Sequence, residues 1–295
     1  MTFLDENYLL GNEPAKRIYQ AIASLPILDA HNHANVKEIA ENANYSDIWF
    51  VEAATDHYVW EVMRKRGIAE DLITGKASNK DKWMALASIF EDLIGNPTYE
   101  WVHLDLKRRF GVNELINKKN AQMIWENTLT ALSKESMKPQ ALLNEMKVEA
   151  MCSTDDPIDT LEFHQKLAQV PGIPKILPTW RPDKAMNIFK PDFPDYIKKL
   201  EERYKKSVNS IDDLVGILQE SHDFFEKHGC KASDHGIEVP YGHNVKKDLA
   251  NAVLQKKLKN ELLTLQETKD YMSYMLQQFG DRKSTRLNSS HGKLS

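Results

Sequence analysis

Two histidines one residue apart, His31 and His33, are the first side chains along the chain whose type and spacing could do chemistry. They follow a short apolar run that contains Ile27 and Leu28. Residues i and i+2 of a strand point to the same face, so both imidazoles could bind one divalent cation such as zinc, with a carboxylate as a third ligand. Ten histidines in 295 residues also give roughly 0.3 such pairs by chance. Metal binding and coincidence both stay open on this pair alone.

Two adjacent carboxylates, Asp155 and Asp156, lie in the segment STDDPID. They could bind a metal, accept protons or bind the hydroxyl groups of a sugar. Asp-Asp-Pro is equally typical of a turn and a helix start, with Pro157 at the first helical position. The segment therefore allows a functional and a structural interpretation.

Further polar candidates follow two other apolar runs. Arg181 lies in TWRPDK, and its planar set of donors suits a substrate carboxylate, although an ion pair with Asp183 is the structural alternative. Asp234 and His235 lie in SDHG and are candidates for substrate binding, with the same ambiguity.

His57 and Tyr58, in ATDHYVW, form one more pair of candidates. They could transfer protons if the helical part of the chain folds over the mouth of a barrel. The alternative is ordinary packing of a helix.

The elements that must position these residues are four short apolar runs, each followed at once by polar side chains. They are PILDAHNH, VEAMCSTDDP, PKILPTWRPD and GCKASDHG. A helix is predicted between the third and fourth runs, with Ser210 and Asp213 as a capping box and Gly229 at its carboxyl end. Its expected apolar face consists of Ile211, Leu214, Val215, Leu218, His222 and Phe225.

Strand, amphipathic helix and strand form the unit of a parallel sheet, and active residues at the carboxyl ends of strands are typical of a (β/α)8 barrel. A doubly wound sheet is the structural rival, but the first strand is not followed by G-x-G-x-x-G and there is no P-loop motif. We therefore predict an α/β chain that forms the N-terminal part of a distorted (β/α)8 TIM-type barrel.

Three regions are expected along the chain. Residues 1–280 would form an incomplete metal-dependent barrel domain, in which residues 36–147 are a mainly helical insertion. Four strands cannot close a barrel of eight. Residues 281–295 show no apolar periodicity and resemble translated sequencing adaptor, so we expect a non-native, disordered tail.

Composition excludes several classes of partner. The net charge of -4 arises from 39 basic and 43 acidic residues that are scattered along the chain. This balance provides no basic surface for nucleic acid or an anionic membrane. The chain shows neither a signal peptide nor an apolar stretch of membrane-spanning length, so we expect a cytoplasmic protein. Cys152 and Cys230 are predicted to be buried, reduced thiols near strand ends.

Taken together, several segments in order resemble the uronate isomerase family, also called glucuronate isomerase, of the amidohydrolase superfamily. The resemblance runs to about Gly280. The segments that carry it are NYLLGNEPAKRIYQ, DAHNH, DHYVWEVMR, GNPTYEWVHLDLKRRFG, STDDPID, TWRPDKAMNI and HGCKASDHG.

The resemblance implies a distorted barrel with a helical insertion and a divalent metal, usually zinc, held by His31, His33 and an Asp of a late strand. It implies interconversion of D-glucuronate with D-fructuronate and of D-galacturonate with D-tagaturonate. His57 and Tyr58 would approach the substrate, and Arg181 would bind its carboxylate. The expected partner is a small hexuronate, and the full-length protein could form a homo-oligomer.

One part of the family pattern has no counterpart in the chain. The late-strand Thr-Asp-Ser-Arg segment, which carries the third metal ligand and a catalytic Arg, is missing. We therefore expect an N-terminal fragment without activity of its own. The alternatives are a metal-dependent hydrolase of the amidohydrolase type and a non-catalytic module that binds a sugar acid.

Overall fold

The structure, a computed structural model, describes residues 3–291, with side chains described up to residue 280. The chain divides into two compact units. A helical unit consists of residues 1–27 and 41–149, and a sheet unit consists of residues 28–40 and those from 150 onward. The helical unit thus contains the N-terminal residues as well as most of the segment that we expected to be an insertion.

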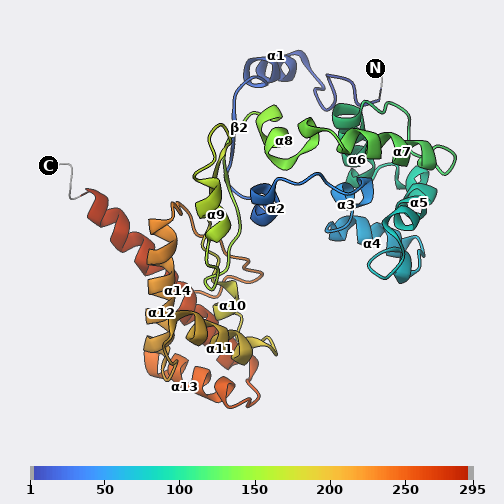
Figure 1. Ribbon diagram of the computed structural model, residues 1–295. Helices are drawn as coiled ribbons and strands as arrows, with labels where there is room; N and C mark the ends of the chain where they lie inside the picture. Colours follow the sequence, from blue (N-terminus) through green and yellow to red (C-terminus); the bar gives the residue numbers. More distant parts are fainter. Residues whose placement is uncertain (1–2, 292–295) are drawn as a thin grey trace. The chain divides into compact units, whose positions relative to one another are not determined.

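The helical unit, drawn in blue to green in Figure 1, consists of short helices joined by tight turns. Its α-helices are α1 (Glu13–Ile22), α3 (Ile48–Glu52), α4 (His57–Lys65), α5 (Asn79–Ile89), α6 (Pro97–Phe110), α7 (Ala121–Leu132) and α8 (Pro139–Glu145). Its 3-10 turns are η1 (Glu70–Leu72), η2 (Phe90–Leu93) and η3 (Glu135–Met137).

Local sequence explains where α6 begins and ends. The Asn96 side chain accepts a hydrogen bond from the backbone N–H of Thr98, and Pro97 occupies the first turn. Three basic residues lie in the last turn, where cations interact favourably with the helix dipole. Gly111 ends the helix with φ of 67°, a left-handed conformation that glycine adopts without strain.

The helical unit has its own apolar core, in which Trp49, Trp83 and Phe90 are fully buried. The indole N–H of Trp83 donates to the carbonyl of Ala121 at 2.9 Å. Side chains of this size, buried with their polar atoms bonded, stabilise the unit by dispersion and by removal of apolar surface from water.

The sheet unit is built on a parallel sheet in the order β1 (Ile27–Asp29), β2 (Val148–Cys152) and β3 (Lys175–Leu177). Strands β2 and β3 pair in parallel, with Met151 opposite Ile176. The helices of the unit are α2 (Val36–Glu41), α9 (Glu162–Leu167), α10 (Asp183–Met186), α11 (Phe193–Tyr204), α12 (Ile211–Lys227), α13 (Lys247–Leu258) and α14 (Leu265–His291). In Figure 1, α10 to α14 gather around one another. The predicted α/β class with a parallel sheet is confirmed.

The fourth predicted strand, GCKASDHG, forms only an isolated parallel bridge between Ser233 and Trp180. Its prediction as a regular strand is therefore wrong. The neighbouring segment explains the difference, because Pro178 and Pro182 lie on either side of Trp180 and carry no N–H for a longer ladder.

Helix α12 begins as predicted, since the Ser210 hydroxyl accepts a hydrogen bond from the N–H of Asp213 at 3.2 Å. Its buried face includes Leu214, Leu218 and Phe225, which belong to the core of the sheet unit. Gly229, with φ of 95°, follows the end of the helix. The periodicity of the sequence thus located this helix and its contribution to the core.

Helix α14 continues to His291, so regular backbone extends into the segment for which we expected disorder. After Gly280, the chain contains neither glycine nor proline up to His291, and such a sequence does not interrupt a helix. Residues 292–295, the rest of the expected tail, lie outside the described residues.

Among the described residues, no helix is long and apolar enough to cross a membrane. Both cysteines are free thiols. Cys230 is buried, whereas Cys152 at the end of β2 is only half-buried, because side chains alternate between the two faces of a strand and the neighbouring Met151 takes the buried one.

Candidate functional site

The loop after β1 holds His31 and His33 close together. Asp29 accepts hydrogen bonds from the backbone N–H of His31 and from the amide of Asn32. The backbone of Asn32 is tied to the end of β2, since its N–H donates to the carbonyl of Cys152 and its carbonyl accepts from the Thr154 hydroxyl. With the loop fixed in this way, the imidazole rings lie 4.9 Å apart, centroid to centroid, and nearly perpendicular.

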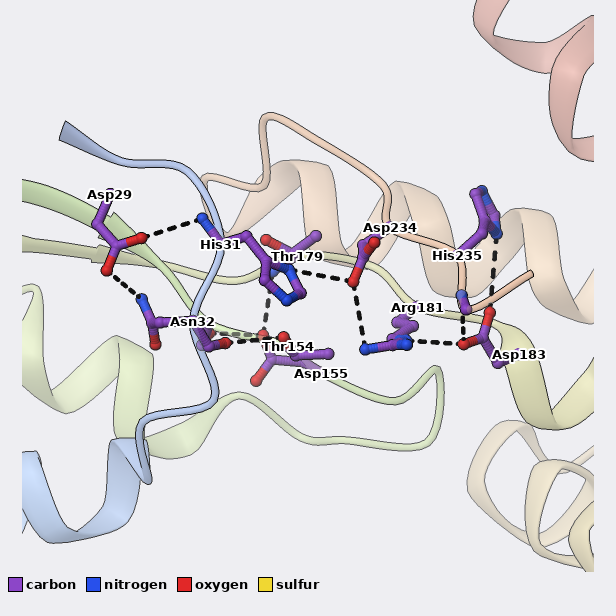
Figure 2. Close-up of polar contacts among 12 residues, drawn as sticks. Asp29, His31, Asn32, Thr154, Asp155, Thr179, Arg181, Asp183, Asp234 and His235 are labelled. Atoms are coloured by element: carbon purple, nitrogen blue, oxygen red, sulfur yellow. Dashed lines mark hydrogen bonds and ion pairs between the residues drawn. The ribbon is translucent and has the colours of Figure 1, made fainter. Parts of the chain in front are cut away.

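Asp234 connects this histidine pair with Arg181. Its Oδ2 lies 3.2 Å from Nδ1 of His31 and 3.3 Å from Nη1 of Arg181. Figure 2 shows Arg181 between two carboxylates, Asp234 on one side and Asp183 on the other. Three candidates from separate parts of the sequence, namely His31, Arg181 and Asp234, are therefore in contact.

Asp183 holds the guanidinium of Arg181 from the other side, with Oδ2 2.7 Å from Nε. The ion pair that we considered as the structural alternative for Arg181 is therefore present. The same oxygen accepts the backbone N–H of Gly236. A Cβ at position 236 would lie 2.6 Å from Nη2 of Arg181 and 2.9 Å from Oδ2 of Asp183, so a larger residue there would displace the ends of these two side chains.

His235 lies beside Asp183 and against α14. Its Nδ1 is 3.9 Å from Oδ1 of Asp183, and its ring stacks on Phe279 with the planes inclined by 12°. The Ser233 hydroxyl lies 3.4 Å from Nε2. The imidazole is thus packed within the sheet unit, next to the carboxylate that holds Arg181.

Asp155, for which the sequence allowed a functional and a structural interpretation, is buried. Its Oδ2 accepts hydrogen bonds from the Ser153 hydroxyl at 2.7 Å and from the N–H of Thr179 at 3.0 Å. Burial raises the pKa of this carboxyl group, against the lowering effect of its two donors. The carboxylate thus joins the segments that follow β2 and β3.

Asp156 belongs to a turn. Its carboxylate accepts from the Tyr196 hydroxyl at 2.8 Å and lies 3.0 Å from the Lys184 ammonium. Its N–H donates to Asp159. The predicted helix start at Pro157 is wrong, because α9 begins only at Glu162, whereas the turn interpretation is confirmed.

Two functional candidates that the sequence analysis missed lie beside Asp155. The Ser153 hydroxyl is 2.8 Å from Nε2 of His164, and both side chains are buried. Burial lowers the pKa of His164 to about 4. His164 also lines a pocket of about 350 Å³, together with Asn35 and Thr154. No spacing or motif in the sequence singled out His164.

His57 and Tyr58 lie in the helical unit, in the first turn of α4. Asp56 caps this helix by accepting the backbone N–H groups of Tyr58 and Val59. Both rings are exposed and lie 4.3 Å apart. They are not packed within the helical unit, so the packing alternative does not explain them.

The donor atoms around His31 meet part of what a divalent cation needs. Two imidazoles side by side suit zinc, and a carboxylate on Nδ1 of His31 orients the ring so that Nε2 is free for a metal. A tetrahedral site also needs further ligands. The described residues contain no group of three potential ligands in metal-binding geometry. The histidine pair therefore fits part of a metal site.

Comparison with known proteins gives a consistent result. Residues 1–288 match the model of a family described as Glucuronate isomerase. A uronate isomerase of Thermotoga petrophila is 49% identical over 278 residues, which are 94% of this chain and 61% of that protein. The uronate isomerase of Caldicellulosiruptor saccharolyticus is 40% identical over 280 residues and is covered to 60%.

Two crystal structures share the fold. That of the Thermotoga maritima uronate isomerase superposes with a TM-score of 0.91 at 48% identity, over 95% of this chain and 62% of that chain. The glucuronate isomerase of Caulobacter crescentus, with a TM-score of 0.87 and 22% identity over 94% of this chain and 60% of that chain, supports the fold alone. The chain thus spans about three fifths of the length of the relatives that it matches.

Proposed function

The chain belongs to the glucuronate isomerase family, and on that premise we propose that the protein of which it is part interconverts hexuronates and their keto forms. The substrates would be D-glucuronate, converted to D-fructuronate, and D-galacturonate, converted to D-tagaturonate. One observation carries the proposal: the Asp234 carboxylate contacts both His31 and Arg181, and so joins a potential metal ligand to a potential carboxylate receptor.

Arg181 would bind the carboxylate at the end of the sugar that does not react. Its guanidinium is already oriented by Asp183 and Asp234, and its side chain is 26% exposed, which leaves part of it accessible. Charge-assisted bonds to a planar carboxylate are strong and directional. A substrate held at this end would present C1 and C2 in a defined position, and positioning of this kind lowers the barrier.

The reaction moves a proton between C2 and C1 through an enediol-like species, which requires a base and a stabiliser for the developing negative charge. The family belongs to the amidohydrolase-like group, which binds a divalent metal. His31 and His33 would hold that metal here, with zinc as the expected ion. The bound cation would supply positive charge near the developing oxyanion.

The remaining roles stay predictions. His57 and Tyr58 would exchange protons with the substrate, as the resemblance to the family implies. His235 would interact with the substrate only indirectly, since its ring faces Asp183 and Phe279. We expect a homo-oligomer in the cytoplasm, and we expect the parallel sheet to be the first part of a (β/α)8 barrel.

The chain of 295 residues would supply one part of the site, and we expect it to be inactive by itself. The test compares it with the protein extended to the length of its relatives. Both are purified with zinc, and the formation of D-fructuronate from D-glucuronate is followed by coupled reduction. The extended protein should convert D-glucuronate, and the 295-residue chain should not.

A double variant, His31→Ala with His33→Ala, tests the metal ligands in the same preparation. It should lose both turnover and bound zinc, measured by elemental analysis of the dialysed protein. A matched control is His228→Ala, which removes the histidine directly after α12; in the described part of the chain its ring bonds to the carbonyl of Phe224 on that helix. Turnover by the double variant at the rate of the control would contradict the proposal.

A further inference from the structure

Asp155 holds the segment that carries Arg181. Its N–H donates to the carbonyl of Thr179, and its carbonyl accepts the N–H of Arg181 at 2.9 Å. Its carboxylate accepts the N–H of Thr179 at 3.0 Å. The backbone and the carboxylate of Asp155 thus bond to both ends of the segment from Thr179 to Arg181.

The segment has few other donors, because prolines precede and follow it at positions 178 and 182. Three N–H groups lie between the prolines, those of Thr179, Trp180 and Arg181. Asp155 accepts two of these three N–H groups, whereas Trp180 in the middle of the segment bonds to the backbone of Ala232 and Asp234. The position of the Arg181 backbone therefore depends directly on Asp155.

Asp155 is in turn held by Ser153 and His164. The Ser153 hydroxyl donates to Oδ2 of Asp155 and lies 2.8 Å from Nε2 of His164. A hydroxyl carries one hydrogen, so once it donates to the carboxylate it can only accept from the imidazole. His164 must then carry its proton on Nε2. The carbonyl of Leu177 also lies within reach of this hydroxyl, at 3.2 Å, but the carboxylate oxygen is closer, at 2.7 Å, and is the stronger acceptor. The order of donation that follows is His164 to Ser153 to Asp155, and all three side chains are buried.

The neutral state of His164 agrees with this order. Burial lowers the pKa of His164, so the imidazole is uncharged at neutral pH and Nε2 can carry its single proton. Buried groups that are fully hydrogen-bonded are held in one geometry, since each alternative leaves a donor or acceptor unpaired.

We propose that Ser153 and His164 are positioning residues for uronate recognition: through Asp155 they fix the backbone of Thr179 to Arg181 and so aim the guanidinium at the substrate carboxylate. This inference rests on the proposed isomerase function. The hydroxyl of Ser153 and the imidazole of His164 would then influence the affinity for the substrate through Asp155 and Arg181.

The variant Ser153→Ala in the extended protein tests the proposal. It leaves Asp155 without one donor and His164 without an acceptor, so the carboxylate can shift. Because the variant leaves a buried group unpaired, KM for D-glucuronate should rise about tenfold, and kcat should change by less than about twofold. Ser153→Thr keeps the hydroxyl and should restore KM.

Ser273→Ala is the matched control. Ser273 is also buried and its hydroxyl also contacts a histidine, Nδ1 of His243 at 3.0 Å, but it lies on α14 and has no contact with Asp155. Its removal should leave KM unchanged. Urea unfolding of every variant separates a change of affinity from a loss of folded protein. Should Ser153→Ala not fold, Ser153→Cys offers a similar shape with a weaker donor.

A double-variant cycle with Arg181→Met gives the readout that a merely structural role would not produce. If Ser153 acts through Arg181, Ser153→Ala should raise KM in the wild-type background and have no further effect in the Arg181→Met background. Equal effects in both backgrounds would overturn the inference, and so would a KM equal to that of Ser273→Ala. If the extended wild-type protein did not convert D-glucuronate, the proposed function itself would be contradicted.

Discussion

Two histidines, one in each unit, are both buried but differ in the groups to which they bond. In the part of the chain that the structure describes, the ring of His103 in the helical unit bonds to backbone groups: Nδ1 to the carbonyl of Tyr99, while Nε2 accepts the N–H of Ile116. His164 in the sheet unit contacts a side chain, the Ser153 hydroxyl, which leads to Asp155. Burial lowers the pKa of both imidazoles and keeps them neutral. Their partners decide whether the ring stabilises a fold or positions a site.

The difference extends to the two units as a whole. In the helical unit, the buried indole N–H of Trp83 bonds to the backbone of another helix, at Ala121. In the sheet unit, the buried carboxylate of Asp155 bonds to the segment that follows β3 and carries Arg181. Changes in the first unit should therefore alter stability, and changes at the sheet edge should alter substrate affinity.

The largest effect on stability is expected for His103→Ala. The variant loses two backbone contacts and leaves a cavity in a well-packed region, so the free energy of unfolding should fall by about 3 kcal/mol. Urea denaturation of the extended protein measures this. KM for D-glucuronate should stay unchanged, and a raised KM without loss of stability would remove the contrast between the two histidines.

Arg181→Met should have the largest effect on activity. Loss of the charged donors should lower kcat/KM for D-glucuronate about 100-fold, with little change in the urea midpoint. The matched control is Arg109→Met, which removes an arginine bonded to Glu145 in the helical unit. A similar loss of kcat/KM in both variants would contradict the assignment of carboxylate binding to Arg181.

Glu52→Gln should make stability less dependent on pH. Burial, with Asp105 and Asp56 nearby, raises the pKa of Glu52 well above 4.5, and its buried Oε1 has no hydrogen-bond partner among the described residues. Below pH 4.5 the group is protonated in both states and has no effect. As the pH rises towards the folded-state pKa, the unfolded chain loses the proton more readily and stability falls.

The variant should therefore exceed the wild type in stability at neutral pH and lose this advantage in acid. Thermal unfolding at several pH values measures the difference. Glu114→Gln, at an exposed position of the same unit, is the control. An advantage that is equal at all pH values would show that ionisation of Glu52 is not the cause.

Ser210→Ala should have the smallest effect. Removal of the cap of α12 leaves the N–H of Asp213 without its partner and should lower the free energy of unfolding by about 1 kcal/mol, with no change in KM. Ser88→Ala, at an exposed position in α5, should be close to neutral. A changed KM in Ser210→Ala would mean that α12 influences the site, which the contrast between stability and affinity does not allow.

Local patterns in the sequence were sufficient to predict elements that depend on only a few neighbouring residues. The cap at Ser210 and the apolar face of α12 follow from spacing alone, and the three strands follow from apolar runs that end in polar residues. The prediction of the fourth strand was wrong for a local reason as well, because Pro178 and Pro182 on either side of Trp180 limit the pairing to one bridge.

The site could be predicted in part. The sequence paired His31 with His33 by the spacing of a strand, whereas the structure holds them together in the loop after β1. Strand ends pointed to Arg181 and Asp234, but the contact of Asp234 with His31 and Arg181 depends on the register of the sheet. His164 could not be found, because its contact with Ser153 spans a loop whose path no local pattern specifies. The same limit explains why the sequence left the functional and the structural interpretation of Asp155 open, although its carboxylate is buried.

Recognition of the uronate carboxylate is the central claim, and its most direct test uses two substrates of the same shape. Turnover of D-glucuronate is compared with that of D-glucuronamide, whose terminal group is uncharged, in the wild-type extended protein and in Arg181→Met. The wild type should strongly prefer the acid, by about 100-fold in kcat/KM, and Arg181→Met should lose this preference. Equal turnover of acid and amide by the wild type, or an undiminished preference in Arg181→Met, would contradict the account.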